Sequence, residues 1–527
     1  MSMSMQETIP GLALAAAANW PDRPAVIDRD ATISFDGLLT TARGVARSLL
    51  ALEVEPGERV ALWLPNRWEW VAAAIGIHCT GAVLVPLNTR LRGREVGDIL
   101  RRTQARVLLS AGRFLNNYYP AMLEGQDLPA LLHVVVVDET EGDDPRQICW
   151  PQFLTAGEDV APERVDARMA GLAGTDLSDI MFTSGTTGQP KGAMFTHAQT
   201  VAAARGTVGL NRLRPADRFG TFGPFSHNAS YKAGWVAGLM SGCAIVITTD
   251  VTPDAMAALI ARQQVSVMPG PPTVWQGILD APGFDGAHLA SLRLISTGGT
   301  TIPVALIRRL NALLGANLVT TGYGLTECCG SVTNTRPGDD AELVATTAGR
   351  VLDGTALRIV DANGRDVPAG EAGEILVRNP SVTLGYLDDP AATARTVDED
   401  GWLHTGDVGV LDGAGNLRIT DRLRDMFIVG GFNCYPAEVE HLLAGLPGLQ
   451  QSAVVGVADG RLGQVGRAFI VPTAGVVLTP ADVIAWSRRN MASYKVPRFV
   501  EIVDALPMTA SGKVMKAELR GRALPDG

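Results

Sequence analysis

The chain has 527 residues, which is more than one compact core usually takes, so we expect roughly two to four structural units. With 46% apolar residues, 58 glycines and 31 prolines, its composition is globular and excludes a fibrous or disordered protein. The formal net charge of −10 excludes the basic surface that DNA and RNA require, so we expect no nucleic acid partner.

The cysteine spacing and the apolar runs indicate the cellular compartment to expect. The six cysteines lack CxxC or Cys/His ligand spacing, which argues against a disulfide scaffold or a zinc site. No Lys or Arg precedes the apolar patch 12–18, so a secretory signal is not expected. The longest apolar run, residues 71–86, contains His78 and is too short for a membrane span. We expect a buried helix leading into a strand there, and a cytoplasmic protein without integral membrane contact.

Helical and strand-like segments alternate over most of the chain. Apolar or β-branched runs bounded by Gly, Pro, Asn or Asp predict buried strands at residues 60–64, 82–87, 107–109, 133–137 and 244–248. Between them, residues 92–102 and 303–314 are predicted helices. This alternation predicts an α/β fold whose parallel sheets carry helices on their faces.

The pattern changes after Gly349. Short strands at residues 357–360, 373–377 and 416–420 are separated by turn sequences and are predicted to form hairpins. The charged stretch 421–425 then interrupts the apolar pattern, and about 100 residues remain, enough for one small domain. We therefore predict an N-terminal domain of residues 1–423 and a C-terminal domain of residues 424–527.

The most specific motif is Thr-Ser-Gly-Thr-Thr-Gly-Gln-Pro-Lys-Gly at residues 183–192, after a predicted strand. Its glycines let backbone N–H groups approach an anion, and its hydroxyls and Lys191 can contact phosphate oxygens. It is not a Walker A loop, because Lys191 is not followed by Ser or Thr and Pro190 lacks an N–H. The motif predicts a phosphate-binding loop rather than an ordinary surface turn.

Three further segments suit a nucleotide. In Thr-Gly-Tyr-Gly-Leu-Thr-Glu, Tyr323 can stack on a base, Thr326 can bond a phosphate and Glu327 can hold Mg²⁺; a solvated helix cap is the alternative. Asp407 follows a glycine and can accept both hydroxyls of a ribose, although such a sequence is often a simple turn. Lys513 lies on a Gly/Ser loop near the end of the chain, where an exposed lysine is the plain alternative.

In order and spacing, these four segments resemble the adenylate-forming superfamily of acyl- and aryl-CoA synthetases, peptide-synthetase adenylation domains and firefly luciferase. The resemblance covers roughly residues 24–519. It implies a large α/β N-terminal domain with a small barrel-like β subdomain, and a small mobile C-terminal α+β domain. It also implies an ATP-dependent acid–CoA ligase, with Mg²⁺, that forms acyl-AMP and pyrophosphate and then acyl-CoA and AMP. Its partners would be a small carboxylic acid, ATP and coenzyme A.

The same resemblance implies roles for individual residues. Lys513, Thr326 and His227 would act in catalysis, and Glu327 would bind the metal. Pyrophosphate, adenine, ribose and pantetheine would be bound by Thr183, Ser184, Gly185, Thr186, Thr187, Gly188, Lys191, Gly298, Gly299, Thr300, Gly322, Tyr323, Gly324, Asp407, Arg422, Gly430, Gly431 and Phe432. The interdomain pivot falls on Arg424, where the superfamily usually has Asp or Lys, so the hinge contacts are left open.

The acid is predicted to contact residues 227–235, 268–275 and 296–302, where Ala229, Ser230, Ala233 and Gly234 leave volume. Lys232 is the one residue there that could meet a charged tail on the acid. The segments 225–234 and 269–273 resemble actinobacterial CoA ligases of steroid breakdown, which activate a propanoate on a fused-ring dione. Medium- or long-chain fatty acids are the alternative.

Two other classes of function are weighed against the ligase. An adenylating module that loads a carrier protein ranks lower, because no carrier domain follows residue 519 and no aspartate near position 229 would bind a substrate amine. A degenerate nucleotide sensor would have lost Lys513 or Glu327, and both are present. A homodimer and acylation of Lys513 are left open by the sequence.

Overall fold

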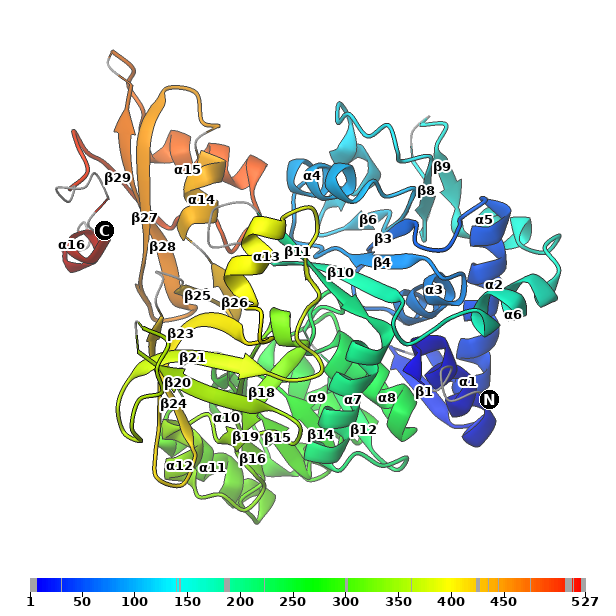
Figure 1. The fold of residues 1–527 in the computed structure, drawn as a ribbon, viewed down its shortest axis with the longest axis horizontal. Helices are drawn as coiled ribbons and strands as arrows, with labels where there is room; N and C mark the ends of the chain where they lie inside the picture. The colour runs from blue at the N-terminus through cyan, green and yellow to red at the C-terminus, as the bar shows by residue number, and fades with distance from the viewer. Residues whose placement is uncertain are drawn as a thin grey trace.

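The computed structural model describes residues 7–29, 31–138, 140–141, 144–183, 190–221, 223–298, 302–361, 363–422, 427–434, 436–443, 445–473, 475–507, 514 and 516–522. Two large, mostly parallel sheets form its centre, and two small antiparallel sheets and a C-terminal sheet lie to one side of them (Figure 1). The predicted α/β fold, with a large N-terminal part and a smaller C-terminal one, is confirmed.

The first large sheet has eight strands, and all its pairs are parallel except β10–β11 and β11–β22. Its strands, in spatial order, are β22 (Gly385–Tyr386), β11 (Lys191–Thr196), β10 (Leu177–Thr183), β4 (Val83–Pro86), β3 (Arg59–Trp63), β5 (Val107–Ser110), β8 (His133–Val136) and β9 (Gln147–Cys149). The predicted central strands are almost entirely buried, as expected for a sheet covered on both faces.

The second large sheet has seven strands and is parallel except for the pair β1–β2. Its strands, in spatial order, are β16 (Val319–Thr320), β15 (Leu294–Ser296), β14 (Val267–Pro269), β12 (Arg218–Thr221), β13 (Ala244–Ile247), β1 (Pro24–Asp28) and β2 (Ala31–Ser34).

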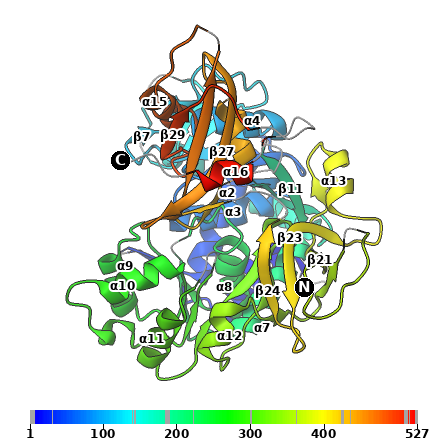
Figure 2. The same ribbon diagram turned by 90° about the vertical axis from the view of Figure 1, so that its left-hand side faces the viewer.

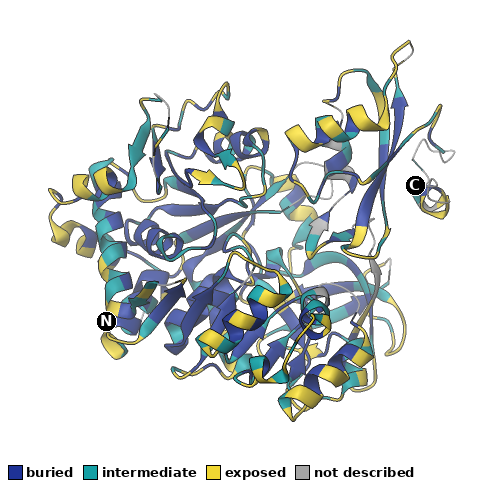
Figure 3. Ribbon diagram, turned by 180° about the vertical axis from the view of Figure 1, so that it is seen from behind, coloured by how far each residue is buried: buried dark blue, intermediate teal, exposed yellow. Residues whose placement is uncertain are grey.

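Helices join and cover these sheets (Figures 1 and 3). In chain order they are α1 (Ile9–Asn19), α2 (Phe35–Ala51), α3 (Trp68–Cys79), α4 (Gly93–Thr103), α5 (Trp150–Ala156), α6 (Pro162–Ala170), α7 (His197–Asn211), α8 (Ala237–Ser241), α9 (Pro253–Gln263), α10 (Pro272–Asp280), α11 (Val304–Leu314), α12 (Ala341–Thr346) and α13 (Pro390–Thr396). As predicted, α3 is buried and leads into β4. It contacts both large sheets and packs closely on α2. The close approach requires glycine at position 76, because a Cβ there would lie 2.7 Å from the Ala42 carbonyl oxygen.

Two small antiparallel sheets follow and share one apolar cluster, and the hairpins predicted after Gly349 lie in the one that spans residues 356–422. One contains β17 (Gly322–Leu325), β18 (Gly330–Asn334) and β19 (Arg350–Val351), and the other contains β20 (Ala356–Val360), β21 (Gly373–Arg378), β23 (Leu403–Leu411) and β24 (Leu417–Arg422). A short hairpin, β6 (Arg113–Phe114) and β7 (Asn117–Tyr118), lies on the first half of the chain.

The C-terminal residues form their own sheet and apolar clusters. The strands are β25 (Phe427–Val429), β26 (Phe432–Cys434), β27 (Leu449–Asp459), β28 (Gly463–Pro472) and β29 (Phe499–Ile502), and the helices are α14 (Pro436–Leu443), α15 (Pro480–Asn490) and α16 (Lys516–Gly521). Figure 2 shows this sheet above the small antiparallel sheet that contains β21, β23 and β24. Among the described residues, no helix is both long and apolar enough to cross a membrane.

Candidate active site

A cavity of about 1900 Å³ lies where the large sheets, the small sheets and the C-terminal sheet meet. This volume exceeds the roughly 300–1,000 Å³ of an ordinary ligand pocket, so it can hold more than one ligand. The cavity brings together the predicted site residues Thr183, Lys191, His227, Gly298, Gly322, Tyr323, Gly324, Thr326, Glu327, Asp407, Gly430, Gly431 and Phe432. Outside the described residues lie Ser184, Gly185, Thr186, Thr187, Gly188, Gly299, Thr300, Arg424 and Lys513.

The phosphate-loop motif begins and ends at one edge of the cavity. Thr183 ends β10 and Lys191 begins β11, and the two residues lie opposite each other in the antiparallel pair. The Thr183 hydroxyl donates to the Lys191 carbonyl at 3.5 Å. The hairpin therefore presents both ends of the motif to the cavity.

The small sheets place the predicted adenine and ribose residues side by side. The Tyr323 hydroxyl donates to the Asp407 carboxylate at 2.7 Å. Burial and the nearby carboxylate raise the pKa of Tyr323 well above its ordinary value, so the hydroxyl stays protonated. Asp407 lies within strand β23 rather than in a simple turn, and Arg422 occupies the opposite register position on β24.

Glu327 is held by a tyrosine that the sequence did not single out. The Tyr386 hydroxyl donates to Glu327 Oε1 at 2.8 Å, and the Lys191 ammonium lies 4.8 Å from the centre of the Tyr386 ring. Burial raises the pKa of the Glu327 carboxyl, while the Tyr386 hydroxyl and the Lys191 charge counteract this. The alternative of a solvated helix cap is wrong, because the carboxylate is half-buried and bonded inside the cavity.

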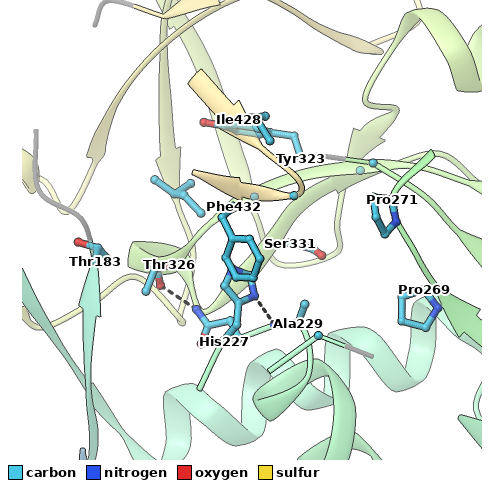
Figure 4. Close-up of a pocket in the computed structure, with 18 of the residues that line it drawn as sticks. Thr183, His227, Ala229, Pro269, Pro271, Tyr323, Thr326, Ser331, Ile428 and Phe432 are labelled. Atoms are coloured by element: carbon cyan, nitrogen blue, oxygen red, sulfur yellow. Dashed lines mark hydrogen bonds between the residues drawn. The ribbon is translucent and has the colours of Figure 1, made fainter. Parts of the chain in front are cut away.

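The loop before the π-helix Tyr231–Val236 carries His227. Its ring is open to the cavity, and Nδ1 accepts the Ala229 N–H at 3.3 Å (Figure 4). That bond leaves the proton of the neutral ring on Nε2. Desolvation by the surrounding protein disfavours the charged ring and lowers the pKa of His227, so the ring is neutral near pH 7. The ring can therefore donate one hydrogen bond to an acceptor in the cavity.

The C-terminal sheet closes the cavity with a glycine turn. Gly430 and Gly431 both have positive φ values, 54° and 86°, and join β25 to β26 in a tight hairpin. Phe432 follows, stacks on Tyr494 at 4.9 Å between ring centres, and faces the Arg90 guanidinium at 5.3 Å. Figure 4 shows Phe432 and His227 in the middle of the cavity, with Thr326 on one side and Pro271 on the other.

Apolar side chains of α7, β12, β14 and α10 form another part of the lining, which we name the apolar wall: Leu210, Phe219, Val267 and Val274. Of the small residues that the sequence singled out, Ala229, Ser230 and Ala233 line the cavity. The expectation that Gly234 leaves volume for the acid is wrong, because Gly234 is buried and is not among the described lining residues.

The suggestion that Lys232 meets a charged tail on the acid is also wrong. Its side chain is fully buried and forms an ion pair with Asp179 at 2.9 Å. The π-helical turn directs this side chain into the protein, while Ala233 faces the cavity. The pattern of small residues did not reveal that direction, because sequence spacing assumes a regular helix.

Comparisons with known proteins agree with this geometry. The sequence matches the AMP-binding enzyme family over residues 14–387 and the AMP-binding enzyme C-terminal domain over residues 438–513. It is 47% identical, over 97% of this chain and 98% of the relative, to a 7a-methyl-1,5-dioxo-octahydro-1H-inden-4-yl propanoyl:CoA ligase from Mycobacterium tuberculosis. A ligase of the same name from Rhodococcus jostii is 44% identical over 97% and 98% of the two chains.

A solved structure extends the similarity to the fold. The o-succinylbenzoate CoA synthetase of Bacillus subtilis, bound with its product analogue OSB-NCoA, has a TM-score of 0.80 at 26% identity and covers 97% of this chain and 98% of its own. The first family match alone spans more than half of the chain. The chain therefore belongs to the family of AMP-binding enzymes, within the adenylate-forming superfamily that its motifs resemble.

Proposed function

We propose that this enzyme is an ATP-dependent acid–CoA ligase whose acid is a propanoate carried on a fused-ring dione. The observation that supports it most is the position of His227, between the nucleotide residues around Thr326 and the Phe432 hairpin, in one cavity with the apolar wall. A carboxylate, a nucleotide and a thiol can meet there. The two ligases from Mycobacterium and Rhodococcus act on an acid with the same two ketones and propanoate.

In the first step, an oxygen of the carboxylate attacks the α-phosphorus of ATP, and pyrophosphate leaves. The reactants are both anions, so groups that neutralise or orient charge dominate catalysis. We assign Thr326 and Lys513 to the α-phosphate, the motif 183–191 to the departing pyrophosphate, and Asp407 with Arg422 to the ribose. The neutral His227 ring would orient the carboxylate by donating from Nε2.

Glu327 fits Mg²⁺ in this proposal. Among the described residues, no group of three or more His, Cys, Asp or Glu side chains could hold a metal ion. A single carboxylate is nevertheless sufficient for Mg²⁺, which usually binds one or two carboxylates together with substrate phosphates and water. When bound, the ion would neutralise charge on those phosphates.

Replacing Tyr386 tests the role of Glu327. Tyr386→Phe removes the hydroxyl that stabilises the carboxylate, so the pKa of Glu327 should rise further. At a given acidic pH, less carboxylate would be available for the metal. We expect the acid limb of the pH profile of kcat/KM for ATP to move to higher pH. The Mg²⁺ concentration that gives half-maximal activity should increase several-fold. Unchanged pH and Mg²⁺ profiles would contradict this role.

In the second step, the CoA thiol attacks the acyl carbonyl, the bond to the phosphate oxygen breaks, and AMP leaves. Gly430, Gly431 and Phe432 would line the path of the pantetheine arm, because the C-terminal hairpin reaches His227 in this arrangement. The similar arrangement of o-succinylbenzoate CoA synthetase, bound with a CoA product analogue, supports this assignment. We expect acyl-AMP formation to use a second orientation of the C-terminal domain, reached by rotation about Arg424, in which Lys513 contacts the α-phosphate.

The apolar wall supports a bulky acid. Ala229 and Ala233 leave space beside His227, and Ala229→Leu should fill it. Overpacking costs about 1–3 kcal/mol, so KM for the ring propanoate should rise roughly tenfold while KM for ATP stays nearly constant. Gly234→Ala is the matched control, because its added Cβ meets only ordinary contacts of 3.5 Å or more. If Ala229→Leu and Gly234→Ala raise KM for the ring propanoate equally, the acid pocket lies elsewhere.

Pyrophosphate release over a panel of acids, with and without CoA, tests the substrate proposal. The ring propanoate should give the highest kcat/KM, and its CoA thioester should accumulate only when CoA is present. A clear preference for fatty acids would favour that alternative. Release and product retention without any effect of CoA would favour a carrier-loading enzyme. The boundary at residues 423/424 and a cytoplasmic location stay predictions, and a homodimer stays open.

A further inference from the structure

A buried ion pair lies beneath the loop that carries His227. Lys232 and Asp179 are both fully buried, with 2.9 Å between Nζ and Oδ1, and the Lys232 ammonium lies 3.6 Å from the centre of the Phe195 ring. Such a pair stabilises a fold no better than apolar side chains of similar size. Lys232 also lies in a π-helical turn, a rare conformation that is frequent at functional sites. Both features indicate a role beyond packing.

Four hydrogen bonds connect Lys232 to the nucleotide side of the cavity. Its ammonium donates to Cys329 Sγ at 3.3 Å, and the Cys329 N–H donates to the Thr326 carbonyl at 2.9 Å. The same carbonyl accepts the side-chain amide of Asn228 at 3.3 Å. The Asn228 backbone carbonyl accepts the Lys232 backbone N–H at 2.9 Å, so the four hydrogen bonds form a closed loop. We name these four residues the Lys232 ring.

The Lys232 ring connects the side of the cavity proposed to bind ATP with the side proposed to bind the acid. Thr326 belongs to the predicted phosphate contacts, while Tyr231, the residue before Lys232, donates its N–H to the His227 carbonyl at 2.9 Å. Asp179 lies in β10, the strand that ends at Thr183. The Ser178 hydroxyl, at 2.6 Å, and a second hydroxyl from Thr200, at 3.2 Å, hold its other oxygen.

Cys329 is the constrained member of the ring. Its φ of 57° lies in the left-handed region, which is unfavourable for a residue with a side chain. Its buried sulfur accepts the hydrogen bond from the Lys232 ammonium at 3.3 Å. The bond from Lys232 therefore holds a strained turn directly after Thr326 and Glu327.

We propose that Lys232, with Asp179 and Cys329, is a positioning residue for acyl-AMP formation, because the Lys232 ring fixes Thr326 relative to His227. This rests on the proposed roles of Thr326 and His227. Attack on the α-phosphorus requires the two anions at a fixed separation, and a displacement of about 1 Å can cost roughly 10²-fold in rate. Once acyl-AMP exists, a covalent bond fixes that separation. Transfer to CoA therefore depends less on the ring.

Removing both charges separates positioning from folding. Asp179→Asn with Lys232→Met leaves no unpaired buried charge and keeps an oxygen that can accept the Ser178 and Thr200 hydroxyls. The double variant should melt within a few degrees of the natural protein. Its kcat for acyl-AMP formation, measured by pyrophosphate exchange at saturating substrates, should fall 10- to 100-fold. Transfer from supplied acyl-AMP to CoA should change less than threefold. Native-like melting together with unchanged pyrophosphate exchange would overturn the proposal.

Cys329 decides the matter if the double variant does not fold. Cys329→Ala removes the acceptor of the ammonium and should lower acyl-AMP formation at least fivefold, whereas Cys329→Ser keeps an acceptor and should restore it to within twofold. Cys328→Ala is the matched control, since this buried thiol lies outside the ring. Equal rates of Cys329→Ala and the natural protein would overturn the proposal, as would equal losses in the Ala and Ser variants.

The acid in these assays is whichever one the natural enzyme adenylates fastest. If the natural enzyme rejects the ring propanoate but adenylates another acid, the proposed substrate fails and the ring is still tested. If the variants lose both half-reactions equally while melting normally, the positioning proposal fails and the proposed substrate is unaffected.

Discussion

Lys513→Ala should lower acyl-AMP formation by about 10²–10³-fold, the usual cost of losing one charged contact to a transition state. Transfer of the acyl group from supplied acyl-AMP to CoA should stay within about threefold, because the α-phosphate chemistry is finished by then. Single-turnover measurements of pyrophosphate release and of thioester formation separate the two steps.

A nearby lysine provides the control. Lys516 forms an ion pair with Glu440 at 2.8 Å in the same C-terminal region, so Lys516→Ala removes a charge without removing the predicted catalytic one. It should leave both half-reactions nearly unchanged. If Lys513→Ala slows both steps equally, then Lys513 is structural, and the assignment from the resemblance is wrong.

Glu95→Gln or Lys495→Met should slow transfer to CoA on the order of 10²-fold while leaving acyl-AMP formation within about threefold. The two side chains are 5% and 2% exposed and form an ion pair at 2.7 Å between α4 and the C-terminal domain. Breaking a buried pair from one side costs about 3–5 kcal/mol, and every 1.4 kcal/mol is tenfold. This cost falls on the arrangement in which Phe432 reaches the cavity. Rapid-quench measurement of thioester formation from supplied acyl-AMP and CoA gives the rate of transfer.

The double variant Glu95→Gln with Lys495→Met should recover much of the lost transfer rate, because neither charge is then left unpaired. The introduced amide oxygen can still accept the Arg92 N–H that Glu95 accepts at 2.9 Å, so the start of α4 is kept. Equal losses in both half-reactions would mean that the pair stabilises the fold in general and not this arrangement of domains.

Much of the fold follows from local sequence pattern. The apolar runs that became β3, β4 and β5 are continuous because both faces of their sheet are covered, and turn residues bound each of them. The motifs around Thr183 and Tyr323 could be found because the phosphate and nucleotide contacts proposed for them require several specific residue types close together in the chain. Gly430 and Gly431 have the positive φ values that a two-residue hairpin demands.

Contacts between distant segments could not be predicted in this way. Tyr386 reaches Glu327 only because β22 pairs with β11, beside the phosphate-loop hairpin. Lys232 looked like a candidate for the substrate pocket because its neighbours are small, but the π-helical turn points it to Asp179. Glu95 and Lys495 are 400 residues apart, and neither stands in a recognisable motif.

The fate of the carboxylate oxygen tests the central claim most directly. The enzyme is incubated with ATP, CoA and an acid that carries ¹⁸O at both carboxylate oxygens, and the products are analysed by mass spectrometry. Attack on the α-phosphorus followed by thiol attack on the carbonyl leaves one carboxylate oxygen on AMP. We therefore expect one ¹⁸O in AMP, none in pyrophosphate, and one in the thioester carbonyl. Label in inorganic phosphate with formation of ADP, or unlabelled AMP, would contradict an acyl-adenylate intermediate.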